Sequence, residues 1–309
     1  MFVVCGEALF DVFSAGETPT GLTLDARVGG SPFNVAVGLA RMAQPVCLLT
    51  QISSGFLGER LMRALRAEGV QTGTVQRSDA PTTLSLVGVD DRGVPSYAFY
   101  GEGCADRLLD GRALQSLPAG VRALNLGSYA TVTGRTAATQ RALVEREHGR
   151  TLIAYDPNIR LNVEPDLAVW RDQIDWMLPR THLLKVSEED LALVHPGVPR
   201  AALAADALAR GVAWVVVTRG GDGAEAWSAA GHLEIAPVKV EVVDTVGAGD
   251  TFQAALLAAL AERGRLTRAA LAALDAAALG EVLAFATRAA AITCSRRGAD
   301  LPRRAELPR

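Results

Sequence analysis

Apolar and polar positions divide the chain into two kinds of segment. From about residue 120 onward, short apolar runs rich in β-branched residues alternate with segments whose apolar residues recur at helical spacing. The runs cover 121–127, 151–156, 182–187 and 212–220, and the helical segments cover 134–148, 165–177, 188–194 and 200–210. These runs are too uniformly apolar to leave one face in water. We therefore expect a parallel sheet covered by helices.

The first 110 residues show a different pattern. The apolar runs 2–6 and 46–51, and helical segments near 32–43 and 56–67, fit the same core. Other stretches alternate apolar and polar residues between Gly, Pro and Asp turns, as strands of a small sheet do. They predict a β-sheet lid formed by about 9–28 and 80–104. Such a sheet needs to cover the core or to pair with a second copy of the chain.

Composition limits the possible functions. The 309 residues are 49% hydrophobic and carry a net charge of −3, which fits one large domain over 1–309 and gives no global attraction to nucleic acid or an anionic membrane. We expect no membrane span, because charged residues interrupt the apolar stretches. The four cysteines match no disulfide or metal pattern and the N-terminus resembles no signal peptide, so we expect reduced thiols and a cytoplasmic location. Lysine occurs only at Lys185 and Lys239, which we interpret as compositional bias.

The stretch DTVGAGDTF, residues 244–252, carries the first candidate chemistry. Glycines at the start of a helix let an anion approach its unpaired N–H groups and the positive end of its dipole. Asp250 would then face the bound anion, where a carboxylate can take a proton from an attacking hydroxyl. The alternative is that Asp250 is an ordinary N-cap after a glycine turn.

Longer motifs support the same chemistry. VDTVGAGDTFQAAL closely resembles the C-terminal signature of the ribokinase-like, or pfkB, carbohydrate kinases, and GGSPFNVAVGLARM (29–42) is similar to their N-terminal element. Further similar elements follow in order: GEALFD, YDPNIR, KVSEED, VVVTRGGDG and AAITCSRRGA. The resemblance implies a Rossmann-like three-layer αβα sandwich with a β-sheet lid. It also implies transfer of the ATP γ-phosphoryl group to a sugar hydroxyl.

The resemblance assigns roles within DTVGAGDTF. Asp250 would be the catalytic base, and the backbone amides of Gly247, Ala248 and Gly249 would form the anion hole. Asp244 and Thr245 would bind a monovalent cation such as K⁺, although turn formation explains the same two residues.

The resemblance also places the sugar. Asp11 and Asn34 would bind its hydroxyls, with Gly29 and Gly30 allowing close approach to the backbone. Asn34 can equally be a residue of the first helical turn, with Ser31 as the cap and Pro32 as the first helical residue, and Gly30 a simple hinge. Arg160 would face substrate or phosphate.

The nucleotide side is predicted from KVSEED and VVVTRGGDG. KVSEED resembles the family's Asn-x-x-Glu element, which acts on Mg²⁺ through water, but Ser187 replaces Asn and Asp190 replaces Glu. Glu188 and Glu189 leave the register of this element open, and Ser187 also suits helix capping. Thr218, Gly220 and Gly223 would line the nucleotide, and a plain hairpin is the alternative for Gly223. We expect adenine to lie against the helix around 283–294.

Two departures from the family pattern bear on the substrate. Gly101 stands where fructokinases and ketodeoxygluconate kinases usually carry Arg, a role that Arg92 or Arg107 could take over, and Gly55 lies in a motif that lacks the usual acid. We favour fructose. The alternatives are ketodeoxygluconate, ribose, inositol or a nucleoside as acceptor, or a sensor of sugar or nucleotide without catalysis. A NAD-binding enzyme is disfavoured, because no GxGxxG follows the first strand. A homodimer through the lid sheet is expected.

Overall fold

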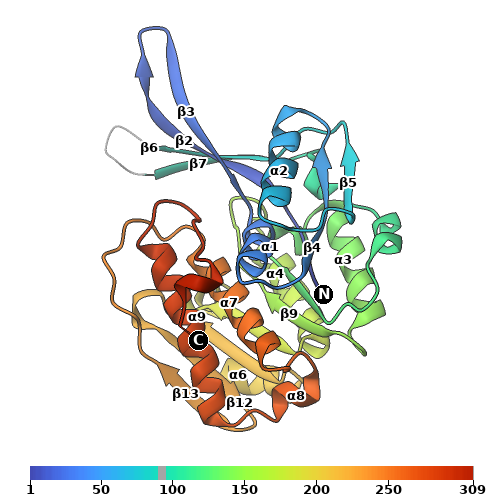
Figure 1. Ribbon diagram of the computed structural model, residues 1–309, viewed down its shortest axis with the longest axis vertical. Helices are drawn as coiled ribbons and strands as arrows, with labels where there is room; N and C mark the ends of the chain where they lie inside the picture. Colours follow the sequence, from blue (N-terminus) through green and yellow to red (C-terminus); the bar gives the residue numbers. More distant parts are fainter. Residues whose placement is uncertain (90–94, 309) are drawn as a thin grey trace.

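The computed structural model describes residues 1–89 and 95–308, and within these ranges nine strands form one large sheet (Figure 1). Its order is β13-β12-β11-β10-β9-β8-β1-β4-β5. The parallel strands are β1 (Phe2–Cys5), β4 (Val46–Ser53), β5 (Val75–Ser78), β8 (Ala123–Gly127), β9 (Leu152–Asp156), β10 (Leu183–Ser187) and β11 (Trp214–Thr218). β12 (Ala224–Ser228) and β13 (Gly231–Ile235) complete one edge as an antiparallel hairpin.

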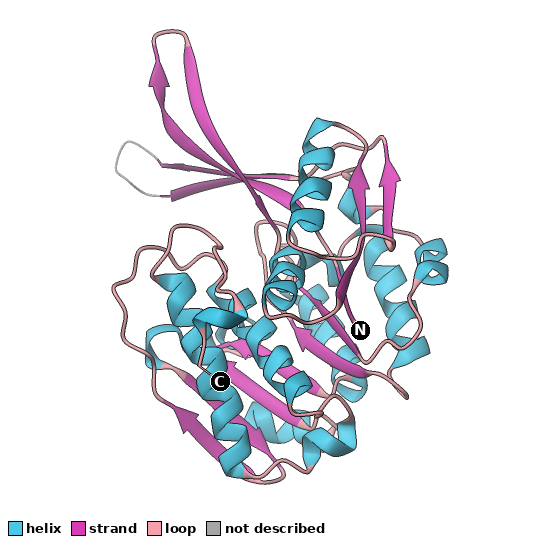
Figure 2. Cartoon of the chain, viewed as in Figure 1, coloured by secondary structure: helices cyan, strands magenta, loops and turns pink. Residues whose placement is uncertain are grey.

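Successive side chains of these strands enter two separate cores. Val4, Leu48 and Leu183 pack with the first core, whereas Val3, Leu49 and Leu184 pack with the second. The first is covered by α1 (Ser31–Arg41), α2 (Phe56–Ala67), α7 (Ala248–Glu262), α8 (Arg268–Ala272) and α9 (Ala276–Cys294). The second is covered by α3 (Gly134–Glu147), α4 (Leu167–Met177), α5 (Glu188–Val194) and α6 (Arg200–Ala209). The predicted three-layer α/β sandwich is confirmed, with both faces of the sheet buried under helices (Figure 2).

Short 3-10 helices connect several of these elements. They are η1 (Ala105–Arg107), η2 (Gly111–Ser116), η3 (Tyr129–Thr131), η4 (Leu178–Arg180), η5 (Gly220–Asp222) and η6 (Arg304–Glu306).

A second sheet of four described strands stands above one end of the sandwich (Figures 1 and 2). It contains β2 (Leu9–Thr18), β3 (Gly21–Gly29), β6 (Leu84–Val89) and β7 (Pro95–Tyr100) in the order β3-β2-β6-β7. The hairpin of β2 and β3 extends beyond the body of the protein (Figure 1). The inner halves of β2 and β3 approach the sandwich, and Phe10 and Val12 are buried in the first core. We call this sheet the lid.

Helix α7 is deeply embedded in the first core. Every residue from 251 to 260 is buried, and the helix packs between α1, α9 and the sheet. Polar contacts fix its rotation and height: Gln253 Nε2 donates to Asn125 Oδ1 of β8 at 2.7 Å, and the Thr251 and Thr293 hydroxyls are 2.8 Å apart. The N-terminus of α7 is therefore held rigidly beside the sheet.

Helix α9 bears on the expectation that the chain contains no membrane span. Its 19 residues are long and apolar enough to cross a membrane by length and composition, although we expected no such segment. In the fold, Leu279, Val282 and Leu283 are buried in the first core and the helix packs along α7. These contacts are those of a core helix.

We expect Gln253→Leu to lower the free energy of unfolding by about 1–3 kcal/mol, because it leaves the buried Asn125 oxygen without its donor. Urea denaturation measures the change. The double variant Gln253→Leu/Asn125→Leu should lose less than the sum of the two single losses. Additive losses would show that the two amides are not coupled.

Candidate active site

A cavity of about 1280 Å³ lies where the carboxyl ends of the parallel strands meet the lid and the N-terminus of α7. Ligand sites of open α/β sheets occupy this position, because successive strands deliver loop residues to one edge. The ends of β1, β8, β9, β10 and β11 contribute Glu7, Ser128, Asp156, Ser187 and Thr218 to its lining. The lid contributes Asp11, Phe13, Ser85, Val87 and Phe99 from the opposite side.

The anion site predicted from the sequence would lie at the first turn of α7. Gly247, Ala248, Gly249 and Asp250 all line the cavity. Gly247 is the N-cap with φ of +77°, and a Cβ there would lie 2.6 Å from that of Ala299. Only glycine fits both constraints. At this turn the Ala248 N–H, one of the three amides expected in the anion hole, already donates to the Thr245 carbonyl at 3.2 Å. The N-terminus of the helix, with the positive end of its dipole, nevertheless lies at the cavity beside Asp250.

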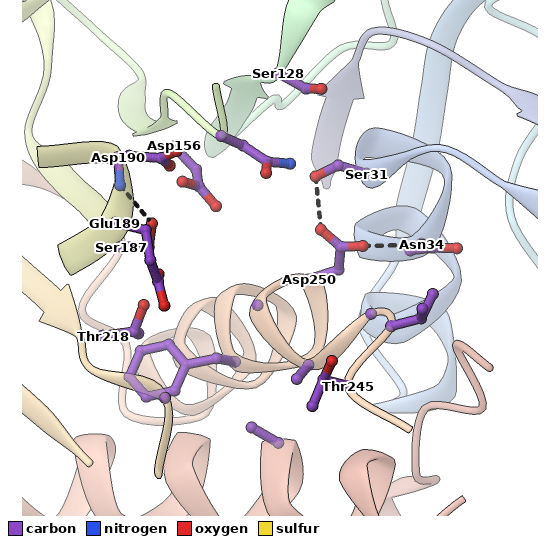
Figure 3. A pocket seen from close by; sticks show the side chains of 18 of the residues that line it. Ser31, Asn34, Ser128, Asp156, Ser187, Glu189, Asp190, Thr218, Thr245 and Asp250 are labelled. Atoms are coloured by element: carbon purple, nitrogen blue, oxygen red, sulfur yellow. Dashed lines mark hydrogen bonds between the residues drawn. The ribbon is translucent and has the colours of Figure 1, made fainter. Parts of the chain in front are cut away.

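Asp250 is held by two side chains of α1, as Figure 3 shows. Ser31 Oγ donates to its Oδ1 at 2.6 Å, and Asn34 Nδ2 donates to its Oδ2 at 2.8 Å. The alternative that made Ser31 the cap of α1 is wrong: Gly30 is the N-cap, with φ of +102°, and Ser31 is the first helical residue. Its hydroxyl is thereby available to Asp250, 219 residues further along the chain.

The surroundings of Asp250 raise the pKa of its carboxyl above the ordinary value, mainly through burial. The hydrogen bonds from Ser31 and Asn34 and the charge of Lys185 act in the opposite direction. A carboxylate that is costly to keep charged but fixed by two donors can accept a proton without moving. This is the behaviour required of a general base.

The sugar-binding residues predicted from the sequence gather at the lid. Asp11 lies on β2, and burial raises its pKa to about 6. Gly30 and Asn34 also line the cavity, whereas Gly29 is absent from the described lining. A Cβ at Gly29 would lie 2.3 Å from Asp11 Oδ2, so this glycine makes room for the Asp11 carboxylate.

Glu7 is a lining residue that the sequence did not single out. It follows β1, is only 1% exposed, and its Oε2 has no hydrogen-bond partner among the described residues. Burial raises its pKa to about 8, so the carboxyl is largely protonated at neutral pH. A neutral acid here can donate a hydrogen bond to a ligand oxygen. Its position directly after the first strand could have indicated a cavity residue, because ligands of open α/β sheets bind at the carboxyl ends of the strands.

The DPNIR loop and the start of α5 face each other across the cavity edge. Asp156 is buried and paired with Lys185, with Asp156 Oδ2 and Lys185 Nζ 2.7 Å apart. Asp190 accepts a hydrogen bond from Ile159 N at 3.2 Å, and burial, then the nearby Asp156, raises its pKa to about 6. Arg160 is exposed at the rim of the cavity, where its guanidinium donates to the Ile159 carbonyl.

The predicted nucleotide residues lie together at the far end. Ser187, Thr218, Gly220 and Gly223 all line the cavity. Ser187 is also the N-cap of α5, accepting from Asp190 N at 3.0 Å, so the capping alternative is correct as well (Figure 3). Gly223 leads into the hairpin partner of β11, as its alternative supposed, and a Cβ there would lie 2.1 Å from the Ile235 carbonyl oxygen.

An apolar wall completes this end. Thr287, Ala290, Ala291 and Cys294 of α9 line it, in the region expected to face adenine. Residues 236–247 also border this end, with Val238, Val240 and Val242 lining the cavity. This contribution could not be predicted from the sequence, because the segment is irregular and its valines resemble a strand.

Asp244 and Thr245 occupy the loop before α7. Both carboxylate oxygens of Asp244 accept backbone hydrogen bonds, from Val246 N at 3.1 Å and from Gly298 N at 2.8 Å. The first is the turn contact expected as the alternative role. Thr245 lines the cavity, whereas Asp244 is absent from the described lining.

The acidic residues of the cavity suit a magnesium ion that arrives with a nucleotide. Asp156, Glu189 and Asp190 would supply the oxygen ligands, and Asp156 Oδ1 is a buried oxygen without a partner in the described structure. Within that part of the chain, no group of three acidic, His or Cys side chains could hold a metal by itself. Such an arrangement fits Mg²⁺ bound through phosphates and water.

Comparison with known proteins decides the family, since the model for the pfkB family carbohydrate kinase matches residues 1–305. The chain belongs to the pfkB family. This carbohydrate kinase is 34% identical over 279 residues to a fructokinase of Rhizobium leguminosarum bv. trifolii, covering 90% of this chain and 85% of the relative. It is 30% identical to fructokinase-1 of Zea mays, covering 99% and 96%.

Solved structures confirm the fold of this pfkB kinase. A fructokinase from Xylella fastidiosa with bound ATP superimposes with a TM-score of 0.86 at 23% identity, covering 96% of this chain and 93% of the other. A fructokinase double mutant from Vibrio cholerae, with fructose, ADP and potassium ion bound, gives a TM-score of 0.79 at 22% identity, covering 96% and 93%.

We expect Ser31→Ala to shift the acid limb of kcat to higher pH. The Ser31 hydroxyl stabilises the charged form of Asp250, so its removal raises the pKa of this carboxyl further and leaves less base at a given pH. A pH profile of kcat with saturating substrates measures the shift, and Ser31→Thr, which keeps the hydroxyl, is the matched variant. An unchanged limb in Ser31→Ala would separate Ser31 from the base.

Proposed function

We propose that this pfkB kinase transfers the γ-phosphoryl group of ATP to a hydroxyl of fructose. The observation that carries the proposal is the placement of Asp250, fixed by Ser31 and Asn34 at the mouth of the α7 anion site and inside one cavity with the lid residues. A non-catalytic sensor would need the N–H groups of that turn but not a positioned base.

The reaction follows from the geometry of the cavity. The nucleotide lies at the end formed by Thr218, Gly220 and the apolar wall, and the sugar lies under the lid beside Asp11. Asp250 accepts the proton of the attacking hydroxyl, and the amides of the first turn of α7 stabilise charge on the transferring group. Asp156, Glu189 and Asp190 would hold the Mg²⁺ that accompanies ATP, and the ion would supply positive charge that offsets the charge of the phosphates. The lid excludes water as a competing acceptor.

A neutral sugar fits the acceptor end better than an acid sugar. Glu7 and Asp11 line it, and a substrate carboxylate near Asp11 would meet a like charge. Position 101 has no room for a side chain, because a Cβ there would lie 2.3 Å from Phe99 Cε1 and 2.8 Å from an Arg107 guanidinium nitrogen. Arg107 instead packs over the Phe99 and Tyr129 rings, at 5.3 and 5.5 Å from their centroids. Arg92 lies outside the described residues.

The decisive experiment is a coupled ADP-release assay with MgATP and a panel of fructose, ribose, ketodeoxygluconate, myo-inositol and adenosine, with a sugar-free blank. We expect fructose to give the highest kcat/KM. Asp250→Asn should reduce kcat by about 10²-fold or more while nucleotide binding persists, because the variant keeps the shape of the site but loses the base. Preference for ketodeoxygluconate would contradict the sugar assignment, and normal turnover by the variant would contradict the base.

The pH dependence tests Asp11. Because burial raises its pKa to about 6, protonation as pH falls through 6 removes a charged acceptor of sugar hydroxyls, and the KM for fructose should rise. Asp11→Asn should show a high KM that no longer changes over this range. A midpoint near the ordinary value of about 4 would contradict the assigned environment.

Three further properties belong to the proposal. We place a monovalent cation such as K⁺ in the Asp244–Thr245 loop, although backbone groups already occupy the Asp244 oxygens.

We infer a homodimer through the lid, supported by the outer strand β3, where Leu22 and Leu24 are 56% and 47% exposed. We also infer the cytoplasm as its location, which suits the free thiols of the four cysteines.

A further inference from the structure

Both lysines of the chain lie at one site. The sequence contains 31 lysines and arginines, and only Lys185 and Lys239 are lysine. Both line the active-site cavity, so the compositional bias toward arginine is broken at the cavity. An ammonium group is compact and can fit where the planar guanidinium of arginine cannot. Both lysines, which the sequence analysis attributes to compositional bias, thus lie where a compact ammonium could contact a ligand.

The fold directs Lys185 toward α7. In β10, Leu183 packs in the first core, and Lys185 lies two residues further along the strand on the same face. Its partner in β11 is Val216, also in the first core. The Lys185 side chain is only 5% exposed. A Cβ added to Gly249 would lie 3.2 Å from Lys185 Nζ, so the ammonium touches the first turn of α7.

Lys185 remains charged in this position. Burial opposes the charge, but Asp156, and after it Asp250 and Asp190, raise the pKa of Lys185 above its ordinary value. Among the described residues its hydrogen-bond acceptor is Asp156 Oδ2 at 2.7 Å, while Asp156 Oδ1 is buried without a partner. An ammonium has three donors. The buried pair is therefore only partly satisfied, and it adjoins the anion site.

We propose that Lys185 is a catalytic residue whose ammonium contacts the phosphoryl group in transfer. It rests on the proposed kinase reaction, in which the bond between the γ-phosphorus and its bridging oxygen breaks as a bond to the sugar oxygen forms. The hydroxyl proton goes to Asp250. Lys185 keeps its own proton and balances charge on the terminal phosphate oxygens, opposite the N–H groups of Gly249 and its neighbours. Its Asp156 partner keeps it in this place before ATP arrives.

Nucleotide binding without sugar tests the contact independently of the sugar's identity. We expect Lys185→Met to weaken binding of a non-hydrolysable ATP analogue by about tenfold or more, the effect of one lost hydrogen bond between charged groups. Binding of ADP, which lacks the γ-phosphate, should change less than about twofold on the same scale. Isothermal titration calorimetry with Mg²⁺ present measures both. Equal losses for the two nucleotides would overturn the proposal.

A double variant separates this role from simple neutralisation of Asp156. Lys185→Met leaves a buried carboxylate unpaired and can destabilise the fold, whereas Lys185→Met/Asp156→Asn removes both charges. We expect the double variant to fold stably, as thermal unfolding would show, and to remain defective in kcat by about 10²-fold or more. Asp156→Asn alone is the matched control. If the double variant matches Asp156→Asn in kcat and in its preference for the ATP analogue, the lysine only neutralises Asp156.

These measurements also separate the two hypotheses. If fructose is not phosphorylated but Lys185→Met still discriminates the ATP analogue from ADP, the sugar assignment fails and the lysine contact stands. If fructose is phosphorylated and Lys185→Met keeps ordinary kcat and ordinary analogue binding, the lysine contact fails alone.

Discussion

The burial of α7 is the constraint on which the rest of the site depends. Ten consecutive residues of this helix are buried, and the three leucines Leu256, Leu257 and Leu260 are each completely covered. Burial of each leucine stabilises the fold by about 1.5–3 kcal/mol, which makes any shift of the helix costly. The hydrogen bond from Gln253 to Asn125 then fixes its position relative to the sheet. A reactive carboxylate at its first turn consequently has one location.

The arrangement of charges in the cavity suits a bound polyanion that carries its own cation. Burial raises the pKa of Asp11, Asp190 and Asp250, which shows that the protein alone does not stabilise their charges well. The compensating groups are the N-terminus of α7 and Lys185, and both line the cavity. Such a cavity disfavours extra negative charge at the acids and favours it at the helix end. Binding of a metal-nucleotide complex would satisfy both sides at once.

The sequence allowed the sandwich, the strands of the second sheet and the glycine turn before α7 to be predicted, because each depends on local periodicity or on a contiguous motif. Contacts between distant residues could not be predicted in this way. Ser31 looked like a helix cap, and its bond to Asp250 depends on how α1 packs against α7. Residues 236–247 form no helix or strand, so no periodic pattern predicted that they line the cavity. The scarcity of lysine was interpreted as compositional bias, because the burial of Lys185 beside Asp156 could not be read from the sequence.

The residues proposed for phosphoryl transfer come from the sandwich, whereas those proposed to bind the sugar come from the lid. Asp250, Lys185 and Asp156 come from elements packed in the sandwich, where a displaced side chain would disturb a core. Asp11, Ser85 and Phe99 come from the lid, whose outer strand is largely exposed. Substitutions in the lid can change sugar contacts at little cost to the sandwich. The acceptor can therefore vary within this fold while the phosphoryl-transfer machinery stays in place.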